Sequence, residues 1–249
     1  MTQASEVLLE LEHVYHRYGW NEVLYDVNLA LSAGEVVAVV GDNGSGKSTL
    51  LKIMAGYHRP TRGVVRFRGQ PIVLDSPGEA RALGIEPVYQ DVAILDDLNL
   101  WRNFFLGKER RRGLFGLGVL AQGWMREECA VRLHEVGLTR VTSVDRPARE
   151  LSGGERQSLA VMRAVYFGIS MLLLDEPTAS RSTRETSHVL AAIVESRNRG
   201  LGILYIDHNV SHVLRIADRI IVLEHARLTK QMKAADVTEN DVSSMLVSS

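Results

Sequence analysis

The octapeptide Gly41-Asp42-Asn43-Gly44-Ser45-Gly46-Lys47-Ser48 is the most informative part of this 249-residue chain. It fits the pattern G-x-x-x-x-G-K-[ST], in which glycines let successive backbone N–H groups turn toward phosphate oxygens. The lysine adds positive charge at the β- and γ-phosphates, and the serine hydroxyl can bind Mg²⁺. The motif therefore predicts a loop that holds the phosphates of a nucleotide.

The flanks of this loop have the expected pattern for a parallel sheet. A continuous apolar run, Val36–Val40, precedes the loop, and a helical pattern over Lys47–Tyr57 follows it. Such a run is typical of a buried parallel strand that leads into a helix. Met171–Leu174 and Ile203–Ile206 are two more such runs, separated by a helical pattern over Thr183–Arg199. Strands that alternate with helices predict a βαβ core and an α/β fold.

Two other regions of the chain have different periodicities. Alternation typical of half-buried strands predicts an antiparallel sheet of hairpins from Leu8–Tyr15, Val23–Leu31 and Val64–Leu74. Between Gln90 and Leu151 the pattern becomes mainly helical, and we expect an inserted lobe with helices over Leu100–Leu106, Arg126–Val136 and then Glu155–Phe167. The glycine-containing stretch Leu114–Met125 is the best candidate for membrane-surface contact, but we expect a solvated loop there.

Composition excludes several classes of protein. Hydrophobic residues make up 45% and charged residues 24% of the chain, as in ordinary globular proteins. The formal charge of −1 gives no general attraction to nucleic acid or anionic lipid. The single cysteine, Cys129, excludes a disulfide framework and fits a reducing compartment. We also expect no signal peptide and no membrane-spanning segment, because the apolar runs are short.

Two further motifs carry chemistry. Asp175 and Glu176 follow the apolar run Met171–Leu174, and ligands gather where parallel strands end. Asp175 can hold Mg²⁺, and Glu176 can orient and deprotonate a water that attacks the γ-phosphate. In Leu151-Ser152-Gly153-Gly154-Glu155 the serine is a predicted helix cap. The two glycines are expected to leave N–H groups open for a second anion.

The order of these motifs resembles the signature of the ATP-binding cassette (ABC) ATPases. The resemblance extends from about Leu8 to Leu246. It implies a P-loop NTPase of ABC type with a RecA-like mixed sheet core, an antiparallel β subdomain and an inserted α-helical subdomain. We expect one domain over residues 1–249, with the core in 1–90 and 168–249 and the helical subdomain in 91–167.

The resemblance also implies ATP and Mg²⁺ as cofactors and a role for each matching residue. The residues implied to bind the nucleotide are Tyr18, Gly41, Asp42, Asn43, Gly44, Ser45, Gly46, Lys47, Ser48 and Thr49. Those implied in catalysis are Glu176, His208, Lys47 and Gln90, and those implied at Mg²⁺ are Ser48, Gln90 and Asp175. Ser152, Gly153, Gly154 and Glu155 would contact the ATP of a partner subunit. For Tyr18, implied to stack on adenine, core packing is the alternative.

Further segments are similar to the branch of the family that energises bacterial monosaccharide importers. They are Ala55–Gly63, the Val-Tyr-Gln-Asp stretch at 88–91, Phe105–Glu109 and His208–Val210. The resemblance implies a head-to-tail homodimer or a pair with a related cassette, membrane permease subunits and, indirectly, a periplasmic or extracellular substrate-binding protein. It implies a peripheral position on the cytoplasmic side of the membrane. Nucleic acid is not expected as a partner.

One loop departs from the family pattern. After Glu176-Pro177-Thr178 the family commonly continues Ser-Ala-Leu-Asp, whereas this chain has Ala179-Ser180-Arg181-Ser182. Because this loop normally lies at the dimer contact, the change bears on communication between two ATP sites. The altered loop leaves a non-hydrolysing partner cassette open as an alternative to a hydrolysing importer subunit. A soluble ABC ATPase that acts on nucleic acid is a second, independent alternative.

Overall fold

A computed structural model describes residues 6–88, 94–112, 118–135, 143–179 and 182–247 of the chain. The chain divides into two compact units. The first comprises Met1–Gln90, Gly168–Ala179 and Ser196–Ser249, and the second comprises Asp91–Phe167 and Ser180–Glu195. Each unit has its own hydrophobic core.

The first unit contains a six-stranded mixed sheet with the strand order β12-β11-β3-β10-β9-β6. The strands are β3 (Val36–Val40), β6 (Ile85–Val88), β9 (Met171–Asp175), β10 (Gly202–Ile206), β11 (Arg219–Glu224) and β12 (Arg227–Lys233). Neighbours pair in parallel except for the antiparallel β11–β12 hairpin. The predicted βαβ core is confirmed, since all three predicted runs are adjacent parallel strands. Every residue of β3 and β10 is buried, which explains their continuous apolar sequences.

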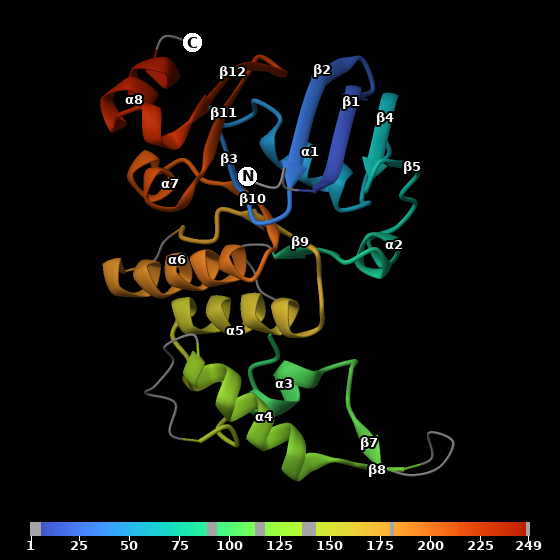
Figure 1. Cartoon of the computed structure of the whole chain (residues 1–249), viewed down its shortest axis with the longest axis vertical. Coiled ribbons are helices and arrows are strands. Elements are labelled where there is room, and N and C mark those ends of the chain that lie inside the picture. The colour runs from blue at the N-terminus through green and yellow to red at the C-terminus, as the bar shows by residue number, and fades with distance from the viewer. Residues whose placement is uncertain (1–5, 89–93, 113–117, 136–142, 180–181, 248–249) are drawn as a thin grey trace, which may run out of the picture. The chain divides into compact units, whose positions relative to one another are not determined.

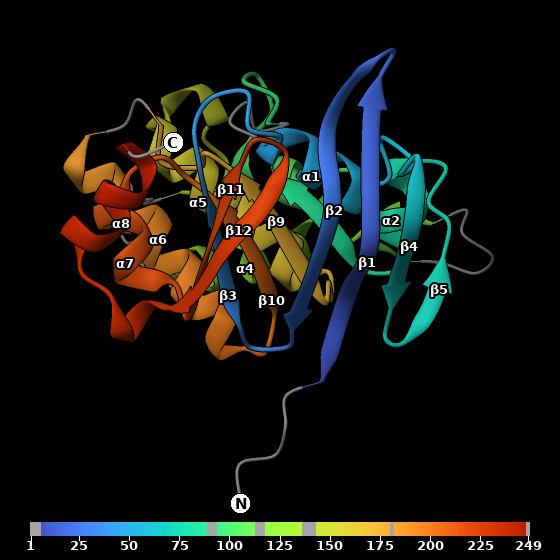
Figure 2. The same ribbon diagram turned by 90° about the horizontal axis from the view of Figure 1, so that it is seen from above.

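A separate four-stranded antiparallel sheet belongs to the same unit, in the order β2-β1-β4-β5 (Figure 2). Its strands are β1 (Val7–Tyr18), β2 (Asn21–Ser32), β4 (Arg62–Phe67) and β5 (Gln70–Ile72). The antiparallel sheet was predicted, but the prediction of one strand over Val64–Leu74 is wrong. Arg68 and Gly69 have φ values of 49° and 75°, so the chain turns there and β5 folds back on β4. Glycine adopts such a φ without steric cost.

The helices of the first unit lie against the strands or against one another (Figure 1). They are α1 (Lys47–Met54), α2 (Pro77–Ala82), α7 (Val210–Ile216), α8 (Glu239–Val247) and the 3₁₀ helix η3 (Ala234–Asp236). Helix α1 ends before the predicted Tyr57, because Gly56 has a φ of 76° and stops the helical path. Leu50, Leu51 and Ile53 of α1 are buried in the core that also contains side chains of β3, β9 and β10.

The second unit is mainly helical, as predicted. It contains α3 (Leu100–Phe105), α4 (Gln122–Glu135), the 3₁₀ helix η2 (Ala148–Glu150), α5 (Gly153–Tyr166), most of α6 (Thr183–Asn198) and a short hairpin of β7 (Arg111–Arg112) and β8 (Val119–Leu120). Its core is aromatic, with Trp101, Phe104 and Phe105 almost completely buried. The expected loop over Leu114–Met125 is wrong where the structure describes it. Residues 119–120 form β8, and α4 begins at Gln122 because Met125 packs into this core.

Within the described residues, no helix has both the length and the apolar character needed to cross a bilayer.

Candidate active site

The candidate site of the first unit lies at the carboxyl ends of three neighbouring strands. β3 leads into the glycine-rich loop, β9 ends in Asp175, and β10 is followed by Asp207 and His208. Ile206 is in register with Asp175 on β9 and with Val39 on β3. The sheet therefore brings together residues that are far apart in the sequence, at the edge where α/β proteins bind ligands. Gln90, which the resemblance implies at Mg²⁺, lies outside the described residues.

The glycines of the loop are required by close backbone contacts. Gly41 has a φ of 153°, and a Cβ there would lie 2.1 Å from the carbonyl oxygen of Leu223. Gly46 has a φ of 112°, and its Cβ would lie 2.4 Å from the carbonyl oxygen of Val23. Both distances are too short for any side chain. The loop conformation, and with it the direction of its N–H groups, therefore depends on glycine at these two positions.

Lys47 points its ammonium group into this loop. Its Nζ donates hydrogen bonds of 2.7 Å to the carbonyl oxygens of Gly41 and Asp42, and the residue is 6% exposed. Burial lowers the pKa of Lys47, while the carboxylates of Glu176 and Asp175 oppose that shift. The positive charge is thus held inside the loop, where it can form charge-assisted hydrogen bonds to phosphate oxygens.

The loop passes a test of fit for phosphate. The hydroxyl oxygen of Ser45 is buried and makes no hydrogen bond within the described part of the chain. A buried hydroxyl without a partner is costly. Together with the buried ammonium and the glycine-lined backbone, it makes a donor set suited to an anion with several oxygens.

Ser48 and Asp175 supply oxygen atoms suited to Mg²⁺. Burial raises the pKa of Asp175, and the nearby Ser48 hydroxyl opposes that shift. No group of three His, Cys, Asp or Glu side chains that could hold a metal occurs in the described ranges. Hard oxygen donors in small number, with the other positions taken by phosphate and water, are typical of Mg²⁺ sites. The residues present fit that ion.

Glu176 and His208 lie side by side on the same edge. Glu176 Oε1 is 3.6 Å from His208 Nδ1, and the side chains are 29% and 64% exposed. Glu176 has a φ of 46°, so the backbone leaves the extended conformation of β9 directly after Asp175. A carboxylate beside an exposed imidazole can orient a water and accept its proton.

Tyr18 ends β1 and is 46% exposed, so core packing is not its role. Its ring meets the edges of two histidine rings, with centroid distances of 4.9 Å to His16 and 5.5 Å to His58. His16 lies opposite Leu24 in the sheet, and Leu24 reaches to within 3.0 Å of the Cβ position of Gly46. Strand β2 thus approaches the phosphate loop through Leu24, and adenine stacking by Tyr18 stays a prediction.

The second unit holds the Leu-Ser-Gly-Gly-Glu motif at the start of α5. The predicted cap is confirmed: Ser152 Oγ accepts a hydrogen bond from the Glu155 amide, and Glu155 accepts one from the Ser152 amide in return. Such a capping box fixes the first turn of the helix. Ser152 and Gly153 stay accessible, whereas Gly154 is buried.

The expectation that both glycine N–H groups are open is wrong for Gly154. Its N–H lies 3.4 Å from Glu185 Oε1, and a Cβ on Gly154 would be 2.6 Å from the Cβ of Glu185. Glu185 was not among the residues predicted from the sequence. Ser182-x-x-Glu185 is a second capping box, at the start of α6, and this signal was available in the sequence. Of the altered loop, Ser180 and Arg181 lie outside the described residues.

Glu185 predicts a measurable pH dependence of stability. Hydrogen bonds from the Ser182 amide and hydroxyl, and from Ser152, lower the pKa of Glu185 from 4.5 to about 2. A carboxyl whose folded pKa is depressed stabilises the fold above its unfolded pKa and loses that effect as pH falls toward the folded pKa. We expect Glu185→Gln to reduce the free energy of unfolding by about 1 kcal/mol at neutral pH, and the difference from wild type to vanish near pH 2.

Urea unfolding of both proteins, followed by circular dichroism over this pH range, measures that difference. Glu127→Gln is the matched control, because Glu127 is an exposed carboxylate on α4 of the same unit. A wild-type and Glu185→Gln pair whose stabilities differ equally at every pH would contradict the assignment.

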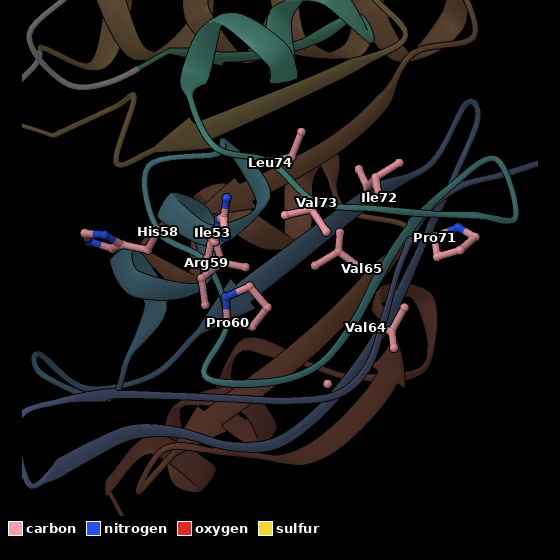
Figure 3. A pocket seen from close by; sticks show the side chains of 11 residues that line it. Ile53, His58, Arg59, Pro60, Val64, Val65, Pro71, Ile72, Val73 and Leu74 are labelled. Carbon is pink, nitrogen blue, oxygen red and sulfur yellow. The ribbon is translucent and has the colours of Figure 1, made fainter.

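A pocket of about 420 Å³ in the first unit is separate from these residues (Figure 3). Its walls are mainly apolar side chains of β4, β5 and the segment after them, including Val65, Ile72 and Val73. His58 also borders it, but Figure 3 shows its ring turned away from the apolar side chains. None of the predicted site residues lines this pocket.

The sequence of the chain is similar to a family model and to several known proteins. A sequence model described as ABC transporter matches residues 24–179. A xylose/arabinose import ATP-binding protein of Sulfolobus acidocaldarius is 39% identical over 241 residues, which are 97% of this chain and 94% of that protein. A fructose import ATP-binding protein of Rhizobium meliloti is also 39% identical, covering 96% and 93% of the two chains. A ribose import ATP-binding protein of Streptomyces coelicolor is 34% identical over 96% of this chain but only 46% of its own length.

Solved structures agree with the fold. An ATP-binding cassette of an ABC transporter superposes with a TM-score of 0.82 over 97% of this chain and 98% of its own, at 24% identity. A component of an ABC transporter complex from Clostridium perfringens gives a TM-score of 0.79 over 96% and 94%, also at 24% identity. At these identities the likeness concerns the fold, and it confirms the predicted fold class.

Proposed function

We propose, on the premise that this chain belongs to the ABC transporter family of ATP-binding proteins, that it hydrolyses ATP to energise the import of a monosaccharide through a separate membrane permease. The family membership follows from the match over residues 24–179 and from relatives that are 39% identical over nearly the whole chain. Members of this family bind ATP. The sugar class is taken from those relatives, whose names specify xylose, arabinose and fructose.

The observation that supports hydrolysis is the meeting of Lys47, Asp175, Glu176 and His208 at one edge of a parallel sheet. In the proposed reaction the loop and Lys47 hold the phosphates of ATP. Glu176 orients a water and accepts its proton, while neutral His208 can donate one hydrogen bond and accept another. Backbone donors and a buried cation stabilise negative charge on the phosphoryl group best when water is excluded.

Mg²⁺ would be held by Ser48 and Asp175, whose side chains interact. Bound there, it would neutralise charge on the phosphate oxygens. Gln90, which the resemblance also assigns to Mg²⁺, keeps that role as a proposal. Tyr18 would stack on adenine, and Asp42, Asn43 and Thr49 would complete the nucleotide contacts, as the resemblance implies.

The partner arrangement is also a proposal. The accessible Ser152 and Gly153 at the start of α5 would contact ATP bound by a second cassette, either another copy of this chain or a related one. We propose that the two compact units form one ATPase domain. The helical unit would receive the permease, and the protein would sit peripherally on the cytoplasmic side of the membrane. A substrate-binding protein would deliver the sugar from the other side.

Reconstitution tests the proposal. The chain is coexpressed with the permease and binding protein encoded nearest to it in its genome, and the complex is placed in proteoliposomes. We expect ATP-dependent uptake of a radiolabelled pentose or of fructose, with ATP hydrolysis stimulated by the binding protein. A complex that contains Glu176→Gln is the control and should transport nothing.

Three other results would overturn parts of the proposal. ATP binding without turnover, even in the complete complex, would favour the non-hydrolysing partner cassette. ATPase activity stimulated by DNA or RNA, with salt-sensitive binding, would favour the nucleic-acid alternative. Hydrolysis with transport of a different solute would retain the ATPase and reject the sugar.

A further inference from the structure

Asp207 is a charged side chain with almost no exposure to solvent. It follows β10 directly and is 1% exposed. A buried carboxylate is costly unless hydrogen-bond donors surround it. Only its neighbour His208 was predicted to have a role. The hydrogen-bond donors around Asp207 show which parts of the site its carboxylate links.

One carboxylate oxygen faces the segment that follows Glu176. Asp207 Oδ2 accepts hydrogen bonds from the hydroxyls of Thr178 and Tyr205. Burial raises the pKa of Tyr205, so its phenol stays protonated and donates. Thr178 Oγ1 also lies 3.1 Å from Nδ1 of His212. Because the threonine hydroxyl gives its proton to Asp207, its lone pair is left to accept the Nδ1–H of His212.

The other carboxylate oxygen faces the turn that carries His208. Asp207 Oδ1 accepts a 2.9 Å hydrogen bond from the backbone N–H of Asn209. Asn209 in turn caps α7, where its side-chain oxygen accepts a hydrogen bond from the His212 amide. Asp207 and Asn209 flank His208 in the chain and are joined by this hydrogen bond. The Asp207 carboxylate therefore fixes the turn that carries His208.

The backbone at Glu176 needs such support. Its φ of 46° is uncommon for a residue with a side chain. Such conformations are strained and persist only where several contacts fix them. The Glu176 N–H donates to the Ile206 carbonyl at 2.9 Å, and the Ala179 N–H donates to the Glu176 carbonyl at 3.2 Å. Thr178, through Asp207, adds a side-chain link from this turn to the end of β10.

We propose that Asp207 is a positioning residue for hydrolysis, one whose two oxygens fix the turns that carry Glu176 and His208. The Thr178 hydroxyl links one turn and the Asn209 amide links the other. The inference rests on the proposed function of Glu176 and His208 in ATP hydrolysis. It assigns Asp207 and Thr178 no contact with ATP. Losing either link should therefore change turnover and leave nucleotide affinity unaffected.

Thr178→Val tests the link with the smallest change in shape, because valine keeps the volume and removes the hydroxyl. We expect turnover to fall about 10- to 100-fold, as for the loss of one hydrogen bond to a charged group. The dissociation constant for ATP, measured by calorimetry in the Glu176→Gln background, should stay within about 2-fold of its value without the valine. Thr178→Ser retains the hydroxyl and should restore most of the turnover.

The matched control is Thr229→Val. Thr229 is exposed on β12 and also donates to a carboxylate, that of Glu224, at 2.9 Å. Its loss should leave turnover unchanged. Asp207→Asn provides a second variant, in which the amide group cannot accept at both positions. It should reduce turnover at least as much as Thr178→Val.

Hydrogen exchange measured by mass spectrometry gives a readout independent of activity. The peptides that contain residues 176–179 and 207–209 should exchange faster in Thr178→Val and in Asp207→Asn, and normally in Thr178→Ser. Exchange of β3 should not change. If wild type hydrolyses ATP and Thr178→Val does so at the same rate, the positioning role is wrong.

A general loss of stability with weaker ATP binding would also overturn it, because the network would then be merely structural. If wild type itself shows no turnover, the proposed function fails, but the exchange result still decides whether Asp207 holds the two turns. Unchanged exchange in both peptides would reject that as well.

Discussion

Replacing Glu176 with glutamine is expected to lower ATP turnover by about 10²- to 10⁴-fold, the usual contribution of a general base. Glutamine keeps the shape of the side chain and its contact with His208, whose Nδ1 lies 3.6 Å from Glu176 Oε1. It cannot accept a proton from the attacking water. Because the phosphate contacts come from the loop and Lys47, ATP affinity should change by less than about 3-fold or rise slightly, since a negative charge is removed.

Turnover is measured by phosphate release from the purified complex, and affinity by calorimetry with ATP. Glu127→Gln, on the exposed face of α4, is the matched carboxylate-to-amide control and should behave as wild type. A Glu176→Gln variant that retains full turnover would show that Glu176 is not the general base. One that loses ATP binding would show that Glu176 shapes the phosphate site instead.

Much of the fold could be predicted because its signals are local. The apolar runs at 36–40, 171–174 and 203–206 predict three buried strands, and all three are adjacent in the sheet. The C-terminal hairpin of β11 and β12 was missed, although Arg219–Glu224 has a comparable apolar run. The predicted strand over Val64–Leu74 failed at Arg68-Gly69, where a turn signal was outweighed by the alternation around it.

The candidate site was predictable only where its residues lie in one motif. The phosphate loop, the Asp175-Glu176 pair and the cap at Ser152 are contiguous patterns with a local physical basis. The contact of Glu185 with Gly154, 31 residues away, and that of Asp207 with Thr178, 29 residues away, follow from no local pattern. The capping box of Glu185 with Ser182 is local and was overlooked. No periodicity encodes which side chains meet across elements. A charged residue directly after a buried strand, as at Asp207, nevertheless indicates a candidate for a buried charge with specific hydrogen-bond partners.

Lys47→Met should weaken ATP binding by about 30- to 1,000-fold, the range expected when one partner of a buried charge pair is removed. Methionine keeps the aliphatic stem, so packing in α1 is largely preserved. The ammonium group that donates to the carbonyls of Gly41 and Asp42 is lost. In wild type the Lys47 ammonium offsets the negative charges of Asp175 and Glu176. Without it, repulsion between these carboxylates and the phosphates lowers ATP affinity further.

Lys52→Met is the control, since Lys52 is exposed in the last turn of the same helix. This variant should bind ATP as wild type does. Calorimetry gives the affinities, and thermal unfolding without nucleotide checks that both variants fold. The comparison with Glu176→Gln separates nucleotide binding from hydrolysis at this site. Lys47→Met should reduce ATP affinity, whereas Glu176→Gln should reduce only the rate of hydrolysis. If Lys47→Met binds ATP normally and fails only in turnover, Lys47 acts on the reacting phosphoryl group and the affinity comes from the loop backbone alone.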